Sequence, residues 1–232
     1  MRVAILDSGL TQGHPHLANA MVTGFSVEGH SAPFVRVDED FSDRTGHGTA
    51  VAAALHRLIP EAELLAVRVL DHELRCTTEA LAEAIRLAAE CSPDVINLSL
   101  GSGRMESEEP LAAAVAYAAA RGAICVAAAH PRGRMLFPAD LPTVLSATTH
   151  RSCPLADLFS VPGPLPRFLA HGFPRPIEGR ATTDNFFGPS FAAVHLCARI
   201  AELLASGPRD FGQICEALET SCVGEWTPGP GH

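Results

Sequence analysis

Short apolar runs alternate along this chain with segments of helical periodicity. Five of the runs are continuous rather than alternating, which is typical of parallel strands that are buried on both faces of a sheet. They are residues 3–6, 64–70, 95–100, 123–128 and 143–148. We expect each run to form a strand of one central sheet.

Between these runs, apolar residues recur three or four positions apart, as on one face of a helix. The helical segments are residues 47–58, 78–91, 109–121, 190–206 and 210–221. Thr77 or Thr78 is placed to cap the second segment, and Pro110 and Gly122 suit the start and end of the third. The alternation predicts an α/β fold, a three-layer sandwich with helices on both faces of a mostly parallel sheet.

The rest of the chain predicts loops within one unit. Residues 150–189 are rich in proline and glycine and predict loops with short extended pieces. No repeat, low-complexity tract or shift in composition marks a boundary, so residues 1–232 are expected to form a single domain. From about residue 222 to residue 232 we expect a loose C-terminal tail.

Composition narrows the classes of function. Hydrophobic residues make up 47% of the 232 residues, enough for a sizeable core, and the formal net charge is -9. Nucleic acid requires a basic surface, so we expect no nucleic-acid partner. No apolar run reaches the length of a membrane-spanning helix, so we expect no membrane partner either.

The start of the chain and its cysteines bear on the compartment. Met1 and Arg2 lead straight into the first predicted strand, without the apolar stretch of a signal peptide. The seven cysteines include no C-x-x-C pair and no zinc-ligand spacing, which favours free thiols in a reducing compartment. We therefore expect a cytoplasmic protein without a cofactor, or a secreted one if an upstream leader has been removed.

Three separated segments converge on one edge of the predicted sheet. Asp7, the segment 99–101 and the pair 129–130 each lie at the carboxyl end of a predicted strand. Ligands of such sheets bind beyond the carboxyl ends of the strands. The sequence therefore predicts a single site at this edge.

Three motifs near that edge contain the residue types of nucleophilic catalysis. Asp7 ends a buried strand, His47 lies between two glycines, and Ser190 opens a helix of small residues. Each alone has an ordinary explanation: a turn aspartate, an incidental histidine in a capping loop, or an N-cap serine. Together they could supply a hydroxyl, a base that takes its proton and a group that orients the base.

The three motifs also resemble a known family. DSG at residues 7–9, GHGT at 46–49 and GPSFAAVH at 188–195 are similar to the Asp, His and Ser signatures of subtilases, in the same chain order. The resemblance covers roughly residues 2–206. It implies a subtilisin-like fold and a serine endopeptidase that acts through an acyl-enzyme.

The resemblance assigns a role to each member of the triad. Asp7 corresponds to the orienting carboxylate, His47 to the general base and acid, and Ser190 to the nucleophile. Residues 137–139 (FPA) resemble a turn in which the family has a cis proline. His130 occupies the position of the family's oxyanion-hole Asn, with the backbone N–H of Ser190 as the second donor. Imidazole can donate, so His130 is either a working substitute or a sign of a weakened enzyme.

Further positions correspond to the family's substrate-binding segments. Side chains at two positions where the family commonly has glycine, Ala129 and Leu136, are expected to narrow the pocket for the residue before the cut. We therefore predict that a small residue precedes the cleaved bond. The whole set of substrate-binding candidates is Ser99, Leu100, Gly101, Ala128, Ala129 and Leu136.

Several points stay open at this stage. The stretch after His47 is short and lacks a calcium-binding loop, so no metal is expected there. Asp43 belongs either to a solvated acidic loop or to a site for a basic substrate residue. The partner is expected to be a peptide or protein substrate, and a propeptide or partner protein absent from this chain is an open possibility. A peptide-binding pseudoprotease and an acyl transferase with the same triad are the alternatives.

Overall fold

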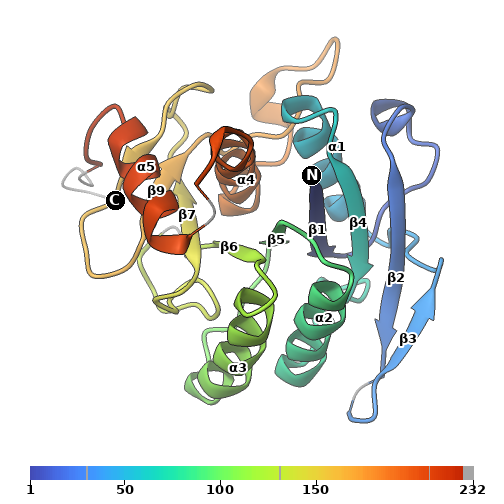
Figure 1. The fold of residues 1–232 in the computed structure, drawn as a ribbon. Coiled ribbons are helices and arrows are strands. Elements are labelled where there is room, and N and C mark those ends of the chain that lie inside the picture. The colour runs from blue at the N-terminus through green and yellow to red at the C-terminus, as the bar shows by residue number, and fades with distance from the viewer. Residues whose placement is uncertain (30, 131, 209, 227–232) are drawn as a thin grey trace.

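The computed structural model describes every residue except 30, 131, 209 and 227–232 (Figure 1). Nine strands form one sheet in the order β3-β2-β4-β1-β5-β6-β7-β9-β8. The strands are β1 (Arg2–Asp7), β2 (Val22–Glu28), β3 (Val35–Asp38), β4 (Glu63–Arg68), β5 (Val95–Leu98), β6 (Ile124–Ala128), β7 (Leu145–Thr149), β8 (Phe159–Ser160) and β9 (Arg167–Ala170).

The sheet is parallel through its centre and antiparallel only at its two edges. Each neighbouring pair from β2 to β9 runs parallel, whereas β3 pairs antiparallel with β2 and β8 with β9. β1, the first strand of the chain, lies between β4 and β5. Its last residue, Asp7, is thereby placed at the carboxyl edge in the middle of the sheet.

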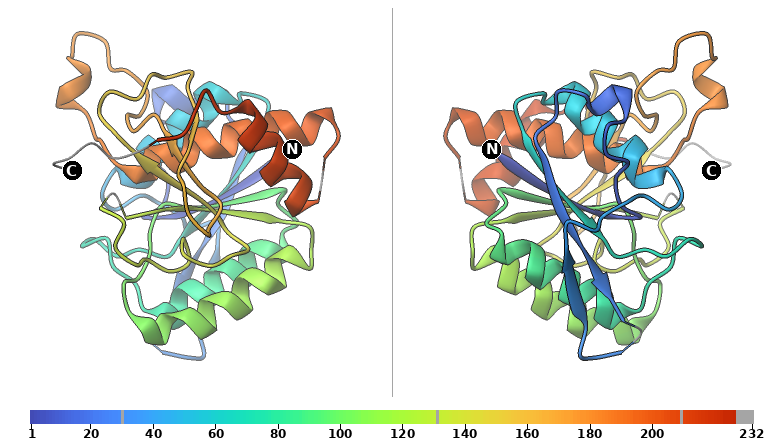
Figure 2. Two further views of the ribbon diagram at one scale, coloured as in Figure 1. Left: turned by 90° about the vertical axis from the view of Figure 1, so that its left-hand side faces the viewer. Right: turned by 90° about the vertical axis from the view of Figure 1, so that its right-hand side faces the viewer.

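Helices cover both faces of the sheet, as Figure 2 shows. α2 and α3 pack on each other and on one face, while α1 and α4 cover the other face, and α5 packs against α4. The helices are α1 (His47–Leu58), α2 (Thr78–Glu90), α3 (Glu108–Ala119), α4 (Pro189–Ser206) and α5 (Phe211–Ser221), with short 3-10 turns at Pro15–Leu17, Met105–Ser107 and Thr182–Asp184. The expected three-layer α/β architecture is confirmed.

Each face of the sheet has its own apolar core. Val51, Phe168 and Phe191 belong to the core under α1 and α4. Phe25 and Ile85 belong to the core on the side of α2 and α3. Burial on both faces is why the central strands are continuous apolar runs, and why periodicity finds them.

The strands missing from the sequence prediction lie outward of this core. β2 and β3 form an antiparallel pair at one edge, and every residue of β3 is at least partly exposed. β2 is buried only over Phe25–Val27 and contains Gly24. Its pattern of buried and exposed positions matches neither the continuous apolar run of a buried strand nor the strict alternation of a half-buried one. β8 and β9 are the short extended pieces expected within residues 150–189.

The described part of the expected tail is attached to the sheet. The backbone N–H of Val223 donates to the carbonyl of Leu158 at 2.9 Å, and that of Trp226 donates to Ser160 at 2.7 Å. Trp226 also contacts the rings of His150 and Phe159. Residues 223–226 thus continue along β8, and residues 227–232 lie outside the described part of the chain.

Candidate active site

Asp7 and His47 form a buried pair at the carboxyl edge of the sheet. The His47 ring nitrogen Nδ1 is 2.8 Å from Asp7 Oδ1 and 3.0 Å from Oδ2. The Asp7 side chain is 1% exposed and the His47 side chain 16% exposed. Asp7 Oδ1 also accepts from the backbone N–H of Ser8 at 2.7 Å. A carboxylate at Nδ1 fixes the ring so that Nε2 is the nitrogen left for a substrate or nucleophile.

Glycines allow the two motifs to approach this closely. A Cβ atom on Gly48 would lie 2.1 Å from the carbonyl oxygen of Gly9 and 3.2 Å from Cβ of Asp7. Gly9 itself has φ +110°, and a Cβ there would lie 2.5 Å from the carbonyl oxygen of Phe41. Neither position tolerates a side chain without movement of the backbone. The glycines beside Asp7 and His47 are therefore explained by the packing of the first turn of α1 against the turn after β1.

Asp43 holds the start of α1 in place. Its Oδ1 accepts from the backbone N–H groups of Thr45 at 2.9 Å and Gly46 at 3.0 Å, and from the hydroxyl of Ser8 at 2.7 Å. Its Oδ2 accepts from the backbone N–H of Thr49 at 2.8 Å and from the Thr49 hydroxyl. Burial alone would raise the pKa of Asp43, but these hydrogen bonds outweigh it and lower the pKa from 3.8. Asp43 is thus a helix cap, a role that the sequence analysis did not consider.

The charge on Asp7 and Asp43 acts on His47. Burial lowers the pKa of His47, whereas the hydrogen bond and charge of Asp7 and the charge of Asp43 raise it. The raising effects prevail, so the pKa of His47 lies above 6.5. The pair therefore favours an imidazolium once the ring has taken a proton, as a general base requires.

Ser190 reaches the same place from the far end of the chain. It occupies the first turn of α4 after Gly188 and Pro189, where the helix dipole favours negative charge. Its hydroxyl donates to the carbonyl oxygen of Ser99 at 3.1 Å, and the Ser99 hydroxyl donates to the carbonyl of Ser190 at 3.3 Å. No hydrogen bond joins Ser190 and His47 among the described residues, and the Ser190 hydroxyl has to turn away from Ser99 before it can donate to His47.

His47 and Ser190 line one cleft of about 840 Å³. Three of the predicted substrate-binding residues, Ser99, Leu100 and Gly101, line the same cleft. Other lining residues come from the loop after β4 and the start of α2, which the sequence analysis did not assign to the site. They include Leu70, Leu74, Arg75, Cys76, Thr77, Thr78 and Glu79. The rule that placed Asp7 at the carboxyl edge would also have found them, because they follow a predicted strand.

The other three substrate-binding candidates are not among the residues that line this cleft. Ala128 and Ala129 are 6% and 1% exposed. Leu136 packs on the segment 99–101, since a Cβ on Gly101 would lie 2.7 Å from its Cγ. The adjoining Ser102 and Phe137 form an antiparallel bridge, and the bond from Phe137 to Pro138 is cis, as the motif predicted.

His130 is engaged by arginines. Its Nε2 is 2.7 Å from Nη2 of Arg134, and its Nδ1 is 3.1 Å from the backbone nitrogen of Arg132. Burial and then the charges of Arg134 and Arg132 lower the pKa of His130 from 6.5. The ring is therefore neutral at pH 7, and any donor role at neutral pH has to use the single N–H of a neutral imidazole.

Phe186 is a further neighbour that sequence reasoning missed. Its ring meets the His47 ring edge-on, with 6.0 Å between centroids, and stacks on Phe191 at 6.1 Å. Phe186 is 48% exposed, so it covers one side of the histidine while facing solvent. It lies four residues before Ser190, and that proximity in sequence is the one signal that pointed to it.

Neither a metal site nor a membrane span stands out in the part of the chain that the structure describes. No group of three or more His, Cys, Asp or Glu side chains there is arranged to hold a metal ion. None of the helices there combines the length and the apolar character needed to cross a bilayer.

Comparison with known proteins decides the family. The model of the subtilase family, Peptidase_S8, matches residues 1–210. The chain belongs to the subtilase family. It is a subtilisin-like serine endopeptidase by that membership, and the resemblance drawn from the three motifs is confirmed.

Curated relatives and solved structures agree with the subtilase assignment. The chain is 32% identical to thermitase from Thermoactinomyces vulgaris over 233 residues, which cover 95% of this chain and 80% of thermitase. It is 31% identical to a thermophilic serine proteinase from Bacillus sp. (strain AK1), covering 94% of this chain but 55% of that protein.

The fold of this subtilase matches that of sphericase, with a TM-score of 0.74 at 22% identity, over 94% of this chain and 82% of sphericase. The S41 psychrophilic protease matches with a TM-score of 0.71 at 23% identity, over the same shares of the two chains. At these identities the two structures support the fold alone.

Proposed function

We propose that this subtilase hydrolyses peptide bonds through Asp7, His47 and Ser190. His47 takes the proton of the Ser190 hydroxyl through Nε2 as the oxygen attacks the substrate carbonyl. The imidazolium so formed faces the carboxylate of Asp7, and it then returns the proton to the leaving amine. Water repeats the sequence and releases the acyl group from Ser190. The pairing of His47 Nδ1 with buried Asp7, beside a cleft that also contains Ser190, is the observation that supports this mechanism most.

For the oxyanion hole we propose the backbone N–H of Ser190 and the ring of His130. The Ser190 amide lies in the first turn of α4, where helix N–H groups point toward developing negative charge. His130 follows the carboxyl end of β6. To donate to the oxyanion, the His130 ring must turn away from its contacts with Arg132 and Arg134. The N–H of the neutral imidazole is then the donor.

For specificity we propose limited processing with a small residue before the cut. The packing of Leu136 on Gly101 and the buried side chain of Ala129 support a shallow pocket. A pocket that excludes large side chains suits the cleavage of a few peptides or proteins rather than general digestion. We keep the cytoplasm as the proposed location, and secretion as the alternative if a leader precedes this sequence.

A fluorophosphonate probe tests the mechanism directly. The probe forms an adduct only with an activated serine, and intact mass shows one added group per chain. We expect labelling of the wild type and none of Ser190→Ala. An unlabelled wild type would contradict the proposal and favour a pseudoprotease. Peptide products of hydrolysis, rather than products joined to an added amine, would separate the endopeptidase from an acyl transferase.

A further inference from the structure

A second cavity of about 390 Å³ adjoins the active-site cleft. Leu70, Arg75, Cys76 and Thr77 line both hollows, so the two share one wall. The second cavity extends from this wall toward β2 and the loop before α1. Three arginines, Arg44, Arg68 and Arg75, line it together with Glu28 and Asp71.

Arg68 is the most buried of these arginines. It is the last residue of β4, and its side chain is 6% exposed. Its Nη2 donates to Glu28 Oε1 at 2.8 Å and to Asp40 Oδ2 at 2.7 Å. Its Nε is buried and has no hydrogen-bond partner within the described part of the chain. A buried N–H without an acceptor is costly and uncommon, so the surroundings of this guanidinium are short of acceptor oxygens.

Arg44 and Arg75 add donors that are also largely unused. The contact of Arg44 Nη2 with Glu28 Oε1 is 3.8 Å, too long for a hydrogen bond. Arg75 uses Nη1 to bind Glu73 at 2.6 Å, and its side chain is mostly in solvent. Each guanidinium has five N–H donors. Both arginines can therefore turn toward a ligand without breaking a buried contact.

The carboxylates of the cavity do not satisfy this set of donors. Glu28 is shared between Arg68 and Arg44. Asp71 Oδ1 accepts from the backbone N–H groups of Glu73 and Arg75 and so closes its own turn. Two carboxylates, Glu28 and Asp71, line the cavity, and Asp40 and Glu73 contact Arg68 and Arg75 from outside its lining, so the three guanidinium groups carry no excess of positive charge. What the cavity has in excess is N–H donors, since Nε of the buried Arg68 has no acceptor among the described residues, and a carboxylate brings the matching acceptors.

We propose that this cavity binds an acidic side chain, Asp or Glu, of the peptide substrate. The proposal rests on the proposed function, because it names the substrate class of the same cleft. The wall that the two hollows share is the reason to choose the substrate as the occupant. A peptide that lies across His47 and Ser190 passes Arg75, and a side chain a fixed number of residues from the cut enters the second cavity.

The position of the acidic residue is found first by mass spectrometry. The wild type digests a mixture of peptides derived from a whole proteome, and the cut sites are aligned. We expect Asp and Glu to be enriched at one fixed distance from the cut. Peptides from this set are then synthesised in pairs with Glu or Gln at that position, and kcat/KM is measured for both.

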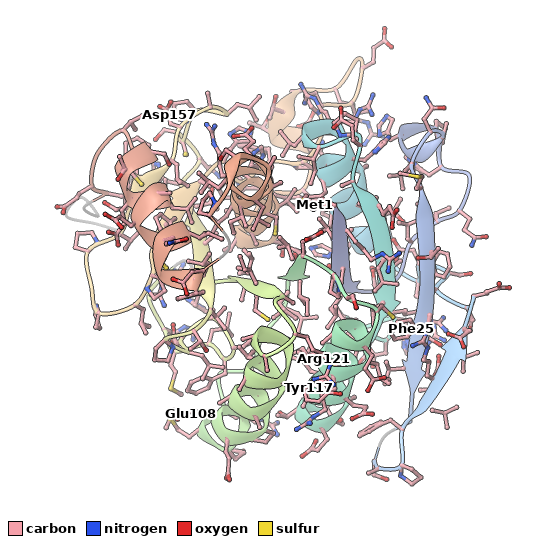
Figure 3. All side chains as sticks on the ribbon, viewed as in Figure 1. Met1, Phe25, Glu108, Tyr117, Arg121 and Asp157 are labelled. Atoms are coloured by element: carbon pink, nitrogen blue, oxygen red, sulfur yellow. The ribbon has the colours of Figure 1, made fainter. Side chains whose placement is uncertain are left out.

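Variants in which glutamine replaces an arginine show which side chain causes the preference for the Glu peptide. In the wild type we expect kcat/KM to be about 1.5–5-fold higher for the Glu peptide than for the Gln peptide, the range for an exposed charged pair, and this ratio to shrink in added salt. In Arg75→Gln the ratio falls toward one. Arg121→Gln removes the same charge from a residue just after α3, which Figure 3 shows beside Tyr117 and which stacks on that ring. This control keeps the wild-type ratio.

The outcomes separate the two proposals. A wild type that reacts with the fluorophosphonate probe but shows no acidic enrichment, or equal rates for Glu and Gln, overturns the acidic site and leaves the mechanism standing. Equal loss of the ratio in Arg121→Gln overturns it as well. If the probe does not react, binding of acetyl-Glu-N-methylamide and its Gln analogue is compared by NMR titration. A saturable shift with the Glu compound alone, lost in Arg75→Gln, supports the site, and equal responses overturn it.

Discussion

Gly48 lies so close to Gly9 that a Cβ atom on Gly48 would be 2.1 Å from the Gly9 carbonyl oxygen. This contact seats the first turn of α1 on the turn after β1. His47 immediately precedes Gly48, and Asp7 lies two residues before Gly9. The contact between the two glycines therefore brings His47 and Asp7 together. The separation of the two side chains is therefore set by backbone packing as well as by their own hydrogen bond.

Gly48→Ala is expected to displace His47. The added methyl group meets backbone rather than a mobile side chain, so α1 has to shift, at a cost of about 1–3 kcal/mol or more. Thermal unfolding gives the loss of stability, and the rate of fluorophosphonate labelling gives the loss of reactivity. Gly224→Ala is the matched control, because no atom lies within 4 Å of its Cβ position. Normal labelling of Gly48→Ala would show that the contact does not position the histidine.

The pH profile of labelling is expected to report His47. The ring must be neutral to take a proton, and its pKa is raised above 6.5, so reactivity should increase with pH through a midpoint above 6.5. Asp43→Asn removes a negative charge that favours the imidazolium, so the midpoint should move to lower pH. Asp38→Asn, an exposed residue of β3, should leave it unchanged. A midpoint that stays in place in Asp43→Asn contradicts the coupling between Asp43 and His47.

Replacement of His130 tests the second oxyanion donor. If the ring donates, His130→Ala should lower kcat by about 10²–10³-fold, the known cost of removing one such donor from subtilisin itself. His130→Asn should retain most of the activity, because an amide also donates. The ratio of wild type to His130→Ala should be constant from about pH 7 to 9, because the lowered pKa keeps the ring neutral there. Full activity of His130→Ala would assign the oxyanion to other donors.

Leu136→Ala is expected to widen the pocket for the residue before the cut. Its side chain packs on Gly101, so truncation opens space beside the segment that lines the cleft. Cleavage after Phe relative to Ala should increase by about 10-fold or more, since one methylene in a pocket alters selectivity by about 10–200-fold. Leu155→Ala, an exposed leucine in a loop, is the control. Efficient cleavage after Phe or Tyr by the wild type would show that the pocket is not narrow.

The pattern of apolar residues predicted the buried central strands of the sheet but not the strands β2 and β3 near its edge. The difference has a physical reason. β1, β5 and β6 are apolar on both faces, so each appears as a continuous run. β2 and β3 are partly exposed, and their pairing depends on a neighbour rather than on their own pattern. Edge strands are specified by what they pair with, and this is not visible in a local window.

The same distinction applies to the site. Asp7, His47 and Ser190 could be proposed as a triad because each lies in a short motif that resembles a subtilase signature. Asp43 caps backbone N–H groups only two to six residues away, but its link to Ser8 spans 35 residues. The cavity around Arg68 likewise depends on distant contacts with Glu28 and Asp40. Such sites are formed by tertiary contacts between residues that carry no shared motif.

The place of β1 in the middle of the sheet has a consequence for synthesis. The ribosome makes Asp7 well before α4, which contains Ser190 and follows more than three quarters of this chain later. At about 5–20 residues per second, on the order of 10–40 s separate the two. During that interval the nascent chain contains Asp7 and then His47, but not Ser190, the proposed nucleophile. The order of the elements therefore delays proteolysis until nearly the whole domain has emerged.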